Sequence, residues 1–343
     1  MSSVSEPPPD SLSASVPSGR ERGIRARYFV TGGTGFIGGR VVRQLLAAGH
    51  RVTAIVRDPD RARDLRSMGV DVRPGDVTVE ESLWSPMAGA DGVFHIAGWY
   101  KVGTRDRGTG ERTNVLGTQN VLTVMKELRI PKGVYTSTLA VFGDTHGKLV
   151  DETYRHDGPW LTEYDRTKWA AHYEVAEPMM REGLPLVIVL PGLTYGPGDT
   201  SEVRPTLVRY LRGRLRALPR GTAYCWGHVD DVADAQILAM EKGVAGESYI
   251  VAGPPHTLVE AFQTAERITG IRAPRVRISP AVLKALAFVS RSERLRDFAG
   301  VTYQGSNAKA RQVLGYEPRP LEVGLRETLA HEMRLLGLPM PAG

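Results

Sequence analysis

Tyr164 and Lys168 are the two side chains whose types and spacing best suit acid–base chemistry. They lie four residues apart, so a helix over this segment places both on one face. A free tyrosine has a pKa of about 10, which is too high for efficient proton transfer near neutral pH. An ammonium group one turn away favours the phenolate and lowers that pKa, so Tyr164 could exchange a proton with a carbonyl or alcohol oxygen. The same spacing also fits a solvated helix face, so neighbouring motifs must decide between the two interpretations.

A glycine-rich turn near the start of the chain predicts a dinucleotide site. Gly32, Gly35 and Gly38 follow the apolar run 28–30 and precede residues 41–49, which have helical apolar spacing and a glycine stop. At such a strand-to-helix turn a pyrophosphate lies against bare backbone and the positive end of a helix. Glycines at this spacing are weak evidence alone, and the strand–turn–helix context makes them strong evidence.

Three hydroxyl side chains, Thr136, Ser137 and Thr138, end an apolar stretch further along. The carboxyl end of a strand is where a doubly wound sheet places its ligands. Ser137 or Thr138 could therefore donate a hydrogen bond to the same substrate oxygen as Tyr164. The alternative is that these hydroxyls only satisfy backbone groups at the strand end.

The elements that must position these residues alternate between strand and helix in the first half of the chain. Helices are expected at Asn114–Leu128 and Glu163–Arg181. This alternation predicts an α/β fold of the Rossmann type, with a doubly wound parallel sheet and helices on both faces. The predicted strands are Arg27–Thr31, Arg51–Val56, Asp71–Pro74, Gly92–Ile96, Gly133–Ser137 and Leu186–Leu190.

After Pro191 the pattern changes to longer loops, which predicts a smaller, mixed C-terminal region that binds the substrate. The predicted division gives residues 26–190 plus 226–255 to the nucleotide-binding domain and residues 191–225 plus 256–335 to the substrate-binding region. After Pro191, helices are expected at Pro205–Leu211, Asp231–Lys242, Leu258–Thr269, Pro280–Val289 and, as a short capped helix, within Ser306–Tyr316.

Composition narrows the class of protein. The 343 residues carry a net charge of +6, but the arginines are scattered and no nucleic-acid motif is present. Nucleic acid is therefore not an expected partner. No apolar run is long enough to span a bilayer, so a membrane is not an expected partner either. No metal site is expected. The single cysteine, Cys225, suits a reducing compartment, and we expect the cytoplasm. Residues 1–25 read as a disordered tail rich in Ser and Pro, with a transit peptide as the weaker alternative.

Several motifs in a fixed order resemble the extended short-chain dehydrogenase/reductase family, also called the NAD-dependent epimerase/dehydratase family. They are the glycine turn, Gly75-Asp76-Val77, His95-Ile96-Ala97-Gly98, Asn114-Val115-Leu116-Gly117-Thr118, Ser137-Thr138, the Tyr164/Lys168 pair, the run from Pro191 to Asp199, and His228-Val229-Asp230-Asp231-Val232-Ala233. The resemblance implies a catalytic triad of Thr138, Tyr164 and Lys168. It also implies cofactor contacts from Gly32, Gly35, Phe36, Ile37, Gly38, Asp76, Val77, Ala97, Gly98, Asn114, Tyr164, Lys168, Pro191 and Leu193.

Arg57 bears on the choice of cofactor. An NAD enzyme usually has an acidic residue at the tip of the second strand to hold the adenosine ribose. Here Arg57 stands nineteen residues past Gly38, and an arginine suits the 2′-phosphate of NADP(H). Asp58 comes one residue later, where it could cap the next turn. NADP(H) is therefore the expected cofactor, and NAD(H) remains the alternative.

Two departures from the family pattern narrow the reaction. Sugar-nucleotide dehydratases of the family carry Asp-Glu after the catalytic Thr, and this chain has Leu139-Ala140, which cannot move a proton. Nucleotide-sugar enzymes commonly place an Arg shortly before the Val-Asp-Asp segment, and Tyr224 is the nearest match here. The chain is most similar to the branch that holds dihydroflavonol-reductase-like and hydroxysteroid-dehydrogenase-like enzymes and hopanoid-associated epimerase-like proteins.

Aromatic residues suggest the substrate end. Trp99, Tyr100, Tyr195 and Trp226 could wall a pocket for an aromatic or alicyclic substrate, or they could be ordinary packing residues. The arginines between residues 204 and 220 could bind an anionic substrate or form a solvated helix face.

Three functions remain open from the sequence. The favoured one is a hydride-transfer enzyme acting on a secondary alcohol or ketone, in which Lys168 also holds the nicotinamide ribose. The alternatives are a sugar epimerase that oxidises its substrate transiently and a cofactor-binding regulator without turnover.

The sequence also predicts a homodimer. The helices Asn114–Leu128 and Glu163–Arg181 carry more large apolar groups than one sheet face readily covers. In the family that the chain resembles, the equivalent helices often pair across a twofold axis. The alternative is that all of these side chains pack against the sheet of their own chain.

Overall fold

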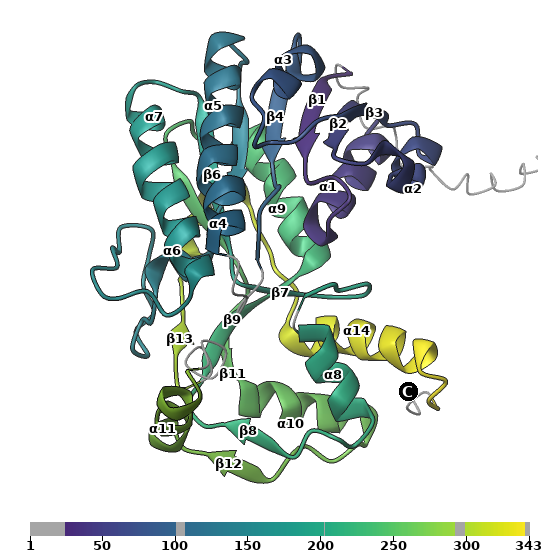
Figure 1. Ribbon diagram of the computed structural model, residues 1–343. Coiled ribbons are helices and arrows are strands. Elements are labelled where there is room, and N and C mark those ends of the chain that lie inside the picture. Colours follow the sequence, from purple (N-terminus) through teal and green to yellow (C-terminus); the bar gives the residue numbers. More distant parts are fainter. Residues whose placement is uncertain (1–24, 101–106, 202, 292–298, 340–343) are drawn as a thin grey trace, which may run out of the picture.

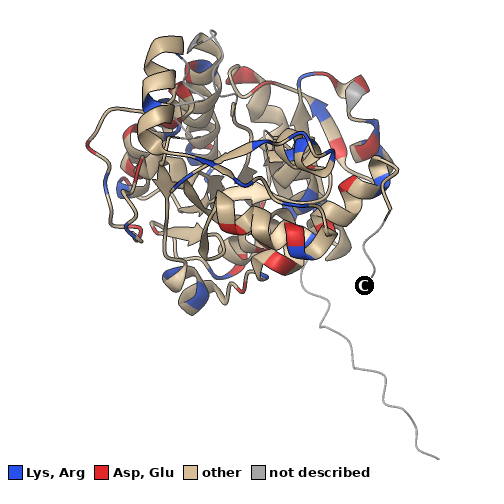
Figure 2. Cartoon of the chain, turned by 90° about the horizontal axis from the view of Figure 1, so that it is seen from below, with Lys and Arg blue, Asp and Glu red and all other residues tan. Residues whose placement is uncertain are grey.

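The computed structural model describes residues 25–100, 107–201, 203–291 and 299–339, and Figure 1 shows a sheet covered by helices with a second lobe below it. The predicted tail, residues 1–25, falls almost wholly outside the described residues. Lys, Arg, Asp and Glu are scattered over much of the chain (Figure 2). Among the described residues, no helix is both long enough and apolar enough to cross a membrane.

The main sheet has seven strands in the order β10-β6-β5-β4-β1-β2-β3, and every pair is parallel. All six predicted strands form, and β10 is an addition that the sequence did not reveal. The central strands are apolar and buried because helices cover both faces of a parallel sheet, as in β6 with Leu-Val-Ile-Val-Leu-Pro. The strands are β1 Arg27–Thr31, β2 Arg51–Val56, β3 Asp71–Pro74, β4 Gly92–His95, β5 Gly133–Thr136, β6 Leu186–Pro191 and β10 Ser248–Val251. This is the doubly wound α/β fold that the sequence predicts.

Two hydrophobic clusters, one on each face of the sheet, attach the helices. One face carries α1 Phe36–Ala47, α2 Arg63–Ser67, α9 Val229–Lys242 and α13 Ala308–Leu314. The other carries α3 Glu81–Met87, α5 Gly117–Glu127, α6 Glu163–Ala170 and α7 Glu177–Arg181, with the short α4 Arg107–Gly110 leading toward α5. The fold therefore brings the carboxyl ends of β1, β4, β5 and β6 to one edge of the sheet.

Each of the two long predicted helices of this second face contains one wider, π-helical turn. The first turn spans Glu111–Leu116, and the second spans Ala171–Ala176. The first helical run also begins earlier than predicted, at Arg107. Such turns are rare and frequently lie at functional sites, and the first of them contains Asn114.

The second lobe forms around β9 Ala223–His228, which is buried along its whole length and pairs with β7, β11 and β13. The other strands are β7 Leu193–Tyr195, β8 Ala217–Pro219, β11 Pro255–Thr257, β12 Val276–Ile278 and β13 Thr302–Tyr303. The helices are α8 Val203–Leu211, α10 Leu258–Thr269, α11 Pro280–Ser290 and α14 Leu321–Leu335. The predicted helices of this region all form, α10 with the predicted ends, whereas α14 was not predicted.

Charged groups at the start of α9 join the two lobes. Asp230 lies 2.8 Å from Arg40 Nε of α1, and Asp231 accepts hydrogen bonds from the backbone N and Nε of Arg319, both at 2.9 Å. Because Arg319 lies two residues before α14, Asp231 ties the sheet to a helix of the second lobe, and Asp230 joins α9 to α1. The pair therefore fixes the relative position of the surfaces that line the site.

Candidate active site

The glycine turn leaves backbone open at the amino end of α1. Gly32 has φ +72°, and a Cβ added there would lie 2.7 Å from Ala97 N, while a Cβ at Gly38 would overlap the carbonyl oxygen of Gly32. The N-cap of α1 is Gly35, which has no side chain to occupy the free N–H groups, and the first turn of the helix carries no acidic residue. These features fit the pyrophosphate of a dinucleotide, which needs close backbone approach and the positive helix end.

A cavity of about 1510 Å³ runs from this turn to the second lobe. It is larger than the usual 300–1,000 Å³ of a small-molecule pocket, so it has room for a cofactor and a substrate together. The predicted site residues that line it are Gly32, Gly35, Phe36, Ile37, Gly38, Arg57, Asp76, Val77, Ala97, Gly98, Trp99, Tyr100, Thr138, Tyr164, Lys168, Pro191, Leu193 and Trp226. Asn114 and Tyr195 are not among its lining residues.

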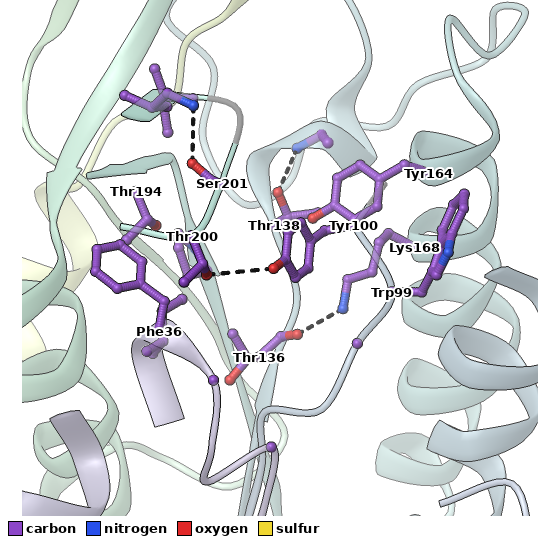
Figure 3. Close-up of a pocket in the computed structure, with 18 of the residues that line it drawn as sticks. Phe36, Trp99, Tyr100, Thr136, Thr138, Tyr164, Lys168, Thr194, Thr200 and Ser201 are labelled. Carbon is purple, nitrogen blue, oxygen red and sulfur yellow. Dashed lines mark hydrogen bonds between the residues drawn. The ribbon is translucent and has the colours of Figure 1, made fainter. Parts of the chain in front are cut away.

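Tyr164 and Thr138 meet in the middle of the cavity (Figure 3). The hydroxyl of Thr162 accepts a hydrogen bond from Asp165 N at 3.1 Å, which starts α6 so that Tyr164 lies in its first turn. Thr138 caps the short helical turn after β5, accepting from Ala140 N at 3.2 Å, and its side chain also hydrogen-bonds Tyr164. Two elements from distant parts of the chain thus bring both hydroxyls to one point.

Ser137 has a different environment from its neighbour Thr138. Its hydroxyl hydrogen-bonds His172 Nδ1 at 2.7 Å, and both side chains are buried. Of the two hydroxyls that the sequence left open, the one at Thr138 faces Tyr164 and the one at Ser137 is engaged in the interior.

Lys168 is buried beneath Tyr164, one helical turn along α6. Its Nζ donates to the carbonyl oxygen of Thr136 at 2.8 Å and to Tyr135 Oη at 3.1 Å. Burial lowers the pKa of Lys168 to about 7. An ammonium group has three N–H donors, and the protein engages two of them, so one donor is left where Lys168 lines the cavity.

A buried chain of polar groups lies behind Lys168. Tyr135 hydrogen-bonds Thr118, which lies 3.0 Å from His95 Nε2, and His95 Nδ1 lies 2.8 Å from Thr31 Oγ1. Thr31 Oγ1 then accepts from the backbone of Ile96 and Ala97 at 3.1 Å. Burial and the nearby Lys168 lower the pKa of His95 to about 3, so the imidazole is neutral. The chain connects the acid–base residues to the strand end beside the glycine turn.

The pKa of Tyr164 differs from the expectation drawn from its spacing to Lys168. Burial raises it to about 12, although the hydrogen bond from Thr138 acts in the opposite direction. The ammonium of Lys168 is turned toward Thr136 and Tyr135, so it does not offset the desolvation of the phenol. Tyr164 is therefore protonated at neutral pH, in the state that donates a proton.

At the far end of the nucleotide half, Arg57 is exposed at the end of β2 and lines the cavity. Asp58 caps the following turn by accepting from Asp60 N at 3.1 Å, as the sequence suggested. Asp76 holds its own loop through two hydrogen bonds from Thr78, both at 2.9 Å. Arg57 is thus the cationic side chain at the place where an adenosine ribose would bind in this fold, beside Asp58, which also lines the cavity.

The position of Asn114 differs from the predicted cofactor contact. The side chain is buried, accepts from Trp99 N at 2.7 Å and donates to Trp99 O at 3.0 Å and to Thr167 Oγ1 at 2.9 Å. Both N–H donors of its amide and its Oδ1 take part in holding the loop after β4 against α6. Asn114 therefore shapes the cavity from behind.

Tyr195 belongs to the core, which is the packing role that the sequence left open for the aromatic residues. The side chain is buried in the second lobe, its hydroxyl donates to Leu321 O at 3.5 Å, and Gly324 leaves the space that it occupies. Trp99, Tyr100 and Trp226 do line the cavity, and the Tyr100 hydroxyl lies 3.5 Å from that of Thr200 on the opposite side (Figure 3).

The substrate end of the cavity has an apolar wall that the sequence did not reveal. Leu207, Leu215, Leu218, Tyr224, Leu258, Phe262, Ile278, Leu283 and Tyr303 line it. They come from α8, α10, α11 and the short strands of the second lobe and the segments between them. No local pattern could have identified them, because each is an ordinary apolar residue in its own segment.

Three comparisons relate the chain to known proteins. The model of the NAD dependent epimerase/dehydratase family matches residues 28–252. A ketoreductase of Stigmatella aurantiaca, named for 4-hydroxy-2-methyl-3-oxo-4-farnesyl-3,4-dihydroquinoline-1-oxide, is 31% identical over 313 residues, which are 85% of this chain and 92% of the relative. Sterol demethylase protein B of Methylococcus capsulatus is 28% identical over 319 residues, which are 88% and 96% of the two chains.

Among solved structures, UDP-glucose 4-epimerase of Thermotoga maritima with UDP-glucose superposes with a TM-score of 0.75. The two chains are 25% identical, and the match covers 90% of this chain and 99% of the epimerase.

Proposed function

The chain belongs to the NAD-dependent epimerase/dehydratase family, and from this premise we propose that it is a nicotinamide-dependent reductase that interconverts a ketone and a secondary alcohol on an apolar substrate. One observation carries the proposal. The hydrogen-bonded pair Thr138–Tyr164 lies with Lys168 between a backbone cradle for a dinucleotide and an apolar wall, within one cavity.

In this proposal Tyr164 is the acid in reduction and the base in oxidation. Its pKa of about 12 keeps the proton on Oη until a substrate oxygen accepts it. Thr138 donates to the same oxygen and orients it. A bound nicotinamide would supply or accept the hydride at the adjacent carbon.

Lys168 has a binding role in the proposal. Its remaining donor faces the cavity and would bind the nicotinamide ribose. Tyr135 and the Thr136 carbonyl hold the amino group of Lys168 in place for this contact.

The wall beside the triad favours reduction over the alternatives. Leu139 and Ala140 line the cavity next to Thr138, where a dehydratase needs an acid and a base. Tyr224 lies in the lining where a nucleotide-sugar enzyme would need an arginine for its diphosphate. A nucleotide sugar would thus meet mainly apolar side chains at this end of the cavity, where Arg209 is the cation that the second lobe contributes to the lining. The names of two relatives, a ketoreductase of a farnesylated quinoline and a sterol demethylase protein, support an apolar substrate.

The test is a series of ketones that share one carbonyl environment and increase in apolar size, each assayed with NADPH and NADH. The proposal expects oxidation of the reduced cofactor, with kcat/KM rising as the apolar part grows. An isomerised nucleotide sugar with no net change in cofactor would contradict it in favour of an epimerase. Cofactor binding without turnover on any member would contradict it in favour of a regulator.

We also propose that the protein is an isologous homodimer through the helical runs that contain Asn114–Leu128 and Glu163–Arg181. On these runs Leu116 is exposed, and Val115, Trp169, Tyr173 and Met180 are half-buried, whereas Leu122, Met125 and His172 are buried in the monomer. Light scattering is expected to give twice the 37.5 kDa chain mass at micromolar concentration. The mass of one chain would contradict the stable dimer.

A further inference from the structure

The outer side of α11 is apolar and uncovered. Leu283 and Ala287 are buried, and the side chains that face outward are Ala281, Val282, Ala285, Leu286, Phe288 and Val289, which we call the α11 face. Phe288 is 86% exposed and Val289 is 83% exposed, more than any other large apolar side chain of the described residues. A helix that is apolar on its outer side as well as its inner side is normally buried on both.

The spacing of these residues gives one continuous face. Val282, Leu286 and Val289 recur at i, i+4 and i+7, and Ala281, Ala285 and Phe288 repeat that pattern one position earlier. Lys284 is the only charged residue within α11, and Arg291 follows its last residue. The α11 face is therefore a broad apolar strip with cations beside it.

The chain around α11 is strongly basic. Residues 209–220 and 271–291 contain ten Lys and Arg residues and no Asp or Glu. They are Arg209, Arg212, Arg214, Arg216, Arg220, Arg272, Arg275, Arg277, Lys284 and Arg291. Nine of the ten are exposed and Arg277 is half-buried, and no ion pair to an acidic residue is recorded for any of them within the described chain.

These two segments lie together. Strands β8 and β12 pair in parallel, Arg220 N donates to Ile278 O, and α11 starts two residues after β12. All three elements form the lower edge of the molecule in Figure 1, and Figure 2 views this side with Lys and Arg in blue. The acidic residues of neighbouring α10, Glu260 and Glu266, accept hydrogen bonds from Thr257 and from Ala273 N.

From this combination we propose that the α11 face and the basic segments around it dock on an anionic lipid bilayer. Apolar side chains would enter the boundary between headgroups and acyl chains, and the arginines would lie among anionic headgroups. The sequence predicted no membrane partner because no apolar run is long enough to span a bilayer. A helix that lies in the membrane interface does not need such a run. The docking does not depend on the proposed reaction.

Charge favours a bilayer over a second copy of the chain as the occupant. An isologous pair would bring the basic segments of two copies against each other, and like charges at contact are repelled. Nucleic acid would match the charge and leave Phe288 and Val289 in water. An anionic bilayer satisfies both properties at once.

Docking would place the apolar end of the cavity beside the lipid. The inward side chain of α11, Leu283, is a cavity wall, as is Ile278 of β12. A lipid-dissolved molecule would then be separated from the cavity by the thickness of one helix.

The experiment is co-sedimentation of the full chain with vesicles of phosphatidylcholine alone or with a quarter phosphatidylglycerol. The proposal expects the protein to pellet with the anionic vesicles and to be released by added salt, because salt screens the headgroup charge. The variant Phe288→Ser/Val289→Ser should lower the partition constant about tenfold or more, since it removes two apolar side chains from the interface. Arg272→Glu/Arg275→Glu should lower it on anionic vesicles alone.

The matched control is Val244→Ser/Leu335→Ser, which removes two exposed apolar side chains elsewhere and should bind as the unmodified chain does. Thermal unfolding of each variant checks that it folds. No preference for anionic vesicles, or equal loss in the α11 variant and the control, would overturn the proposal. A change of mass in light scattering on substitution of Phe288 and Val289 would also overturn it, because the occupant would then be a second copy.

Discussion

At one end of the cavity a ligand would face main chain, and at the other end it would face side chains. The phosphate end is formed by residues close together in the sequence. There is no room for a Cβ atom at Gly32 or Gly38, and the amino end of α1 presents free N–H groups. The apolar end is made by single side chains such as Leu215, Phe262 and Leu283, from segments far apart in the chain. A ligand common to many proteins can be recognised by backbone, whereas a particular substrate needs side chains that vary from one protein to the next.

The triad lies between these two ends and differs from both. Tyr164 and Thr138 meet from separate elements, and burial shifts the pKa values of Tyr164 and Lys168. The comparison thus separates three kinds of structure: a cradle of backbone, a wall of side chains, and a buried polar centre that joins them.

Replacing Arg57 is expected to give the largest change at the nucleotide end. If the guanidinium binds a 2′-phosphate, Arg57→Ala should weaken NADPH binding about ten- to a hundredfold and leave NADH binding unchanged. Calorimetric titration measures both. Arg63→Ala is the matched control, because Arg63 is exposed nearby and does not line the cavity. Equal affinities of the unmodified protein for the two cofactors would contradict the role.

A substitution in the apolar wall should act on the substrate alone. Leu215 is half-buried and lines the cavity, so Leu215→Asn removes apolar contact and should raise KM for a large apolar ketone about tenfold. Cofactor affinity should stay unchanged. Val208→Asn, on α8 and outside the cavity lining, controls for damage to the fold. A matching loss of cofactor affinity in Leu215→Asn would mean that the two ends are not separate.

Lys168 should also affect the stability of the folded chain. Its pKa is about 7 in the folded chain and about 10.5 when unfolded, so between these values the unfolded chain binds more protons. The free energy of unfolding of the unmodified protein should therefore rise, relative to Lys168→Met, by about 2 kcal/mol between pH 7 and 9. Denaturant unfolding without cofactor at both pH values measures it. A difference that does not change with pH would mean that the lysine keeps its ordinary pKa.

The sequence was informative wherever function rests on consecutive residues. The glycine turn, the cap at Asp58 and the strands β1, β2 and β3 follow from local patterns, and the structure has them at the predicted positions. Helix α10 also has its predicted ends, because Thr257 and Gly270 are strong capping residues.

The sequence was uninformative where a residue contacts side chains or backbone groups that are far from it in the sequence. Helix α14 contains Gly324, and glycine is a poor helix former. A glycine is needed at this position because the Tyr195 hydroxyl packs where a side chain would be. Asn114 was assigned to the cofactor from its position in a motif, and Tyr195 was a pocket candidate because it is aromatic. Their side chains contact Trp99 and Leu321. The raised pKa of Tyr164 depends on burial and on the direction of Lys168 Nζ, neither of which spacing along a helix determines.

The most direct measurement is the turnover of Tyr164→Phe beside its cofactor affinity. Loss of a positioned acid–base group should lower kcat by a factor on the order of a hundred or more, with cofactor binding and folding unchanged. Tyr173→Phe, which removes a phenol hydroxyl outside the cavity from the same helical run, should keep normal turnover. Turnover of Tyr164→Phe close to that of the unmodified protein would contradict the proposed proton transfer.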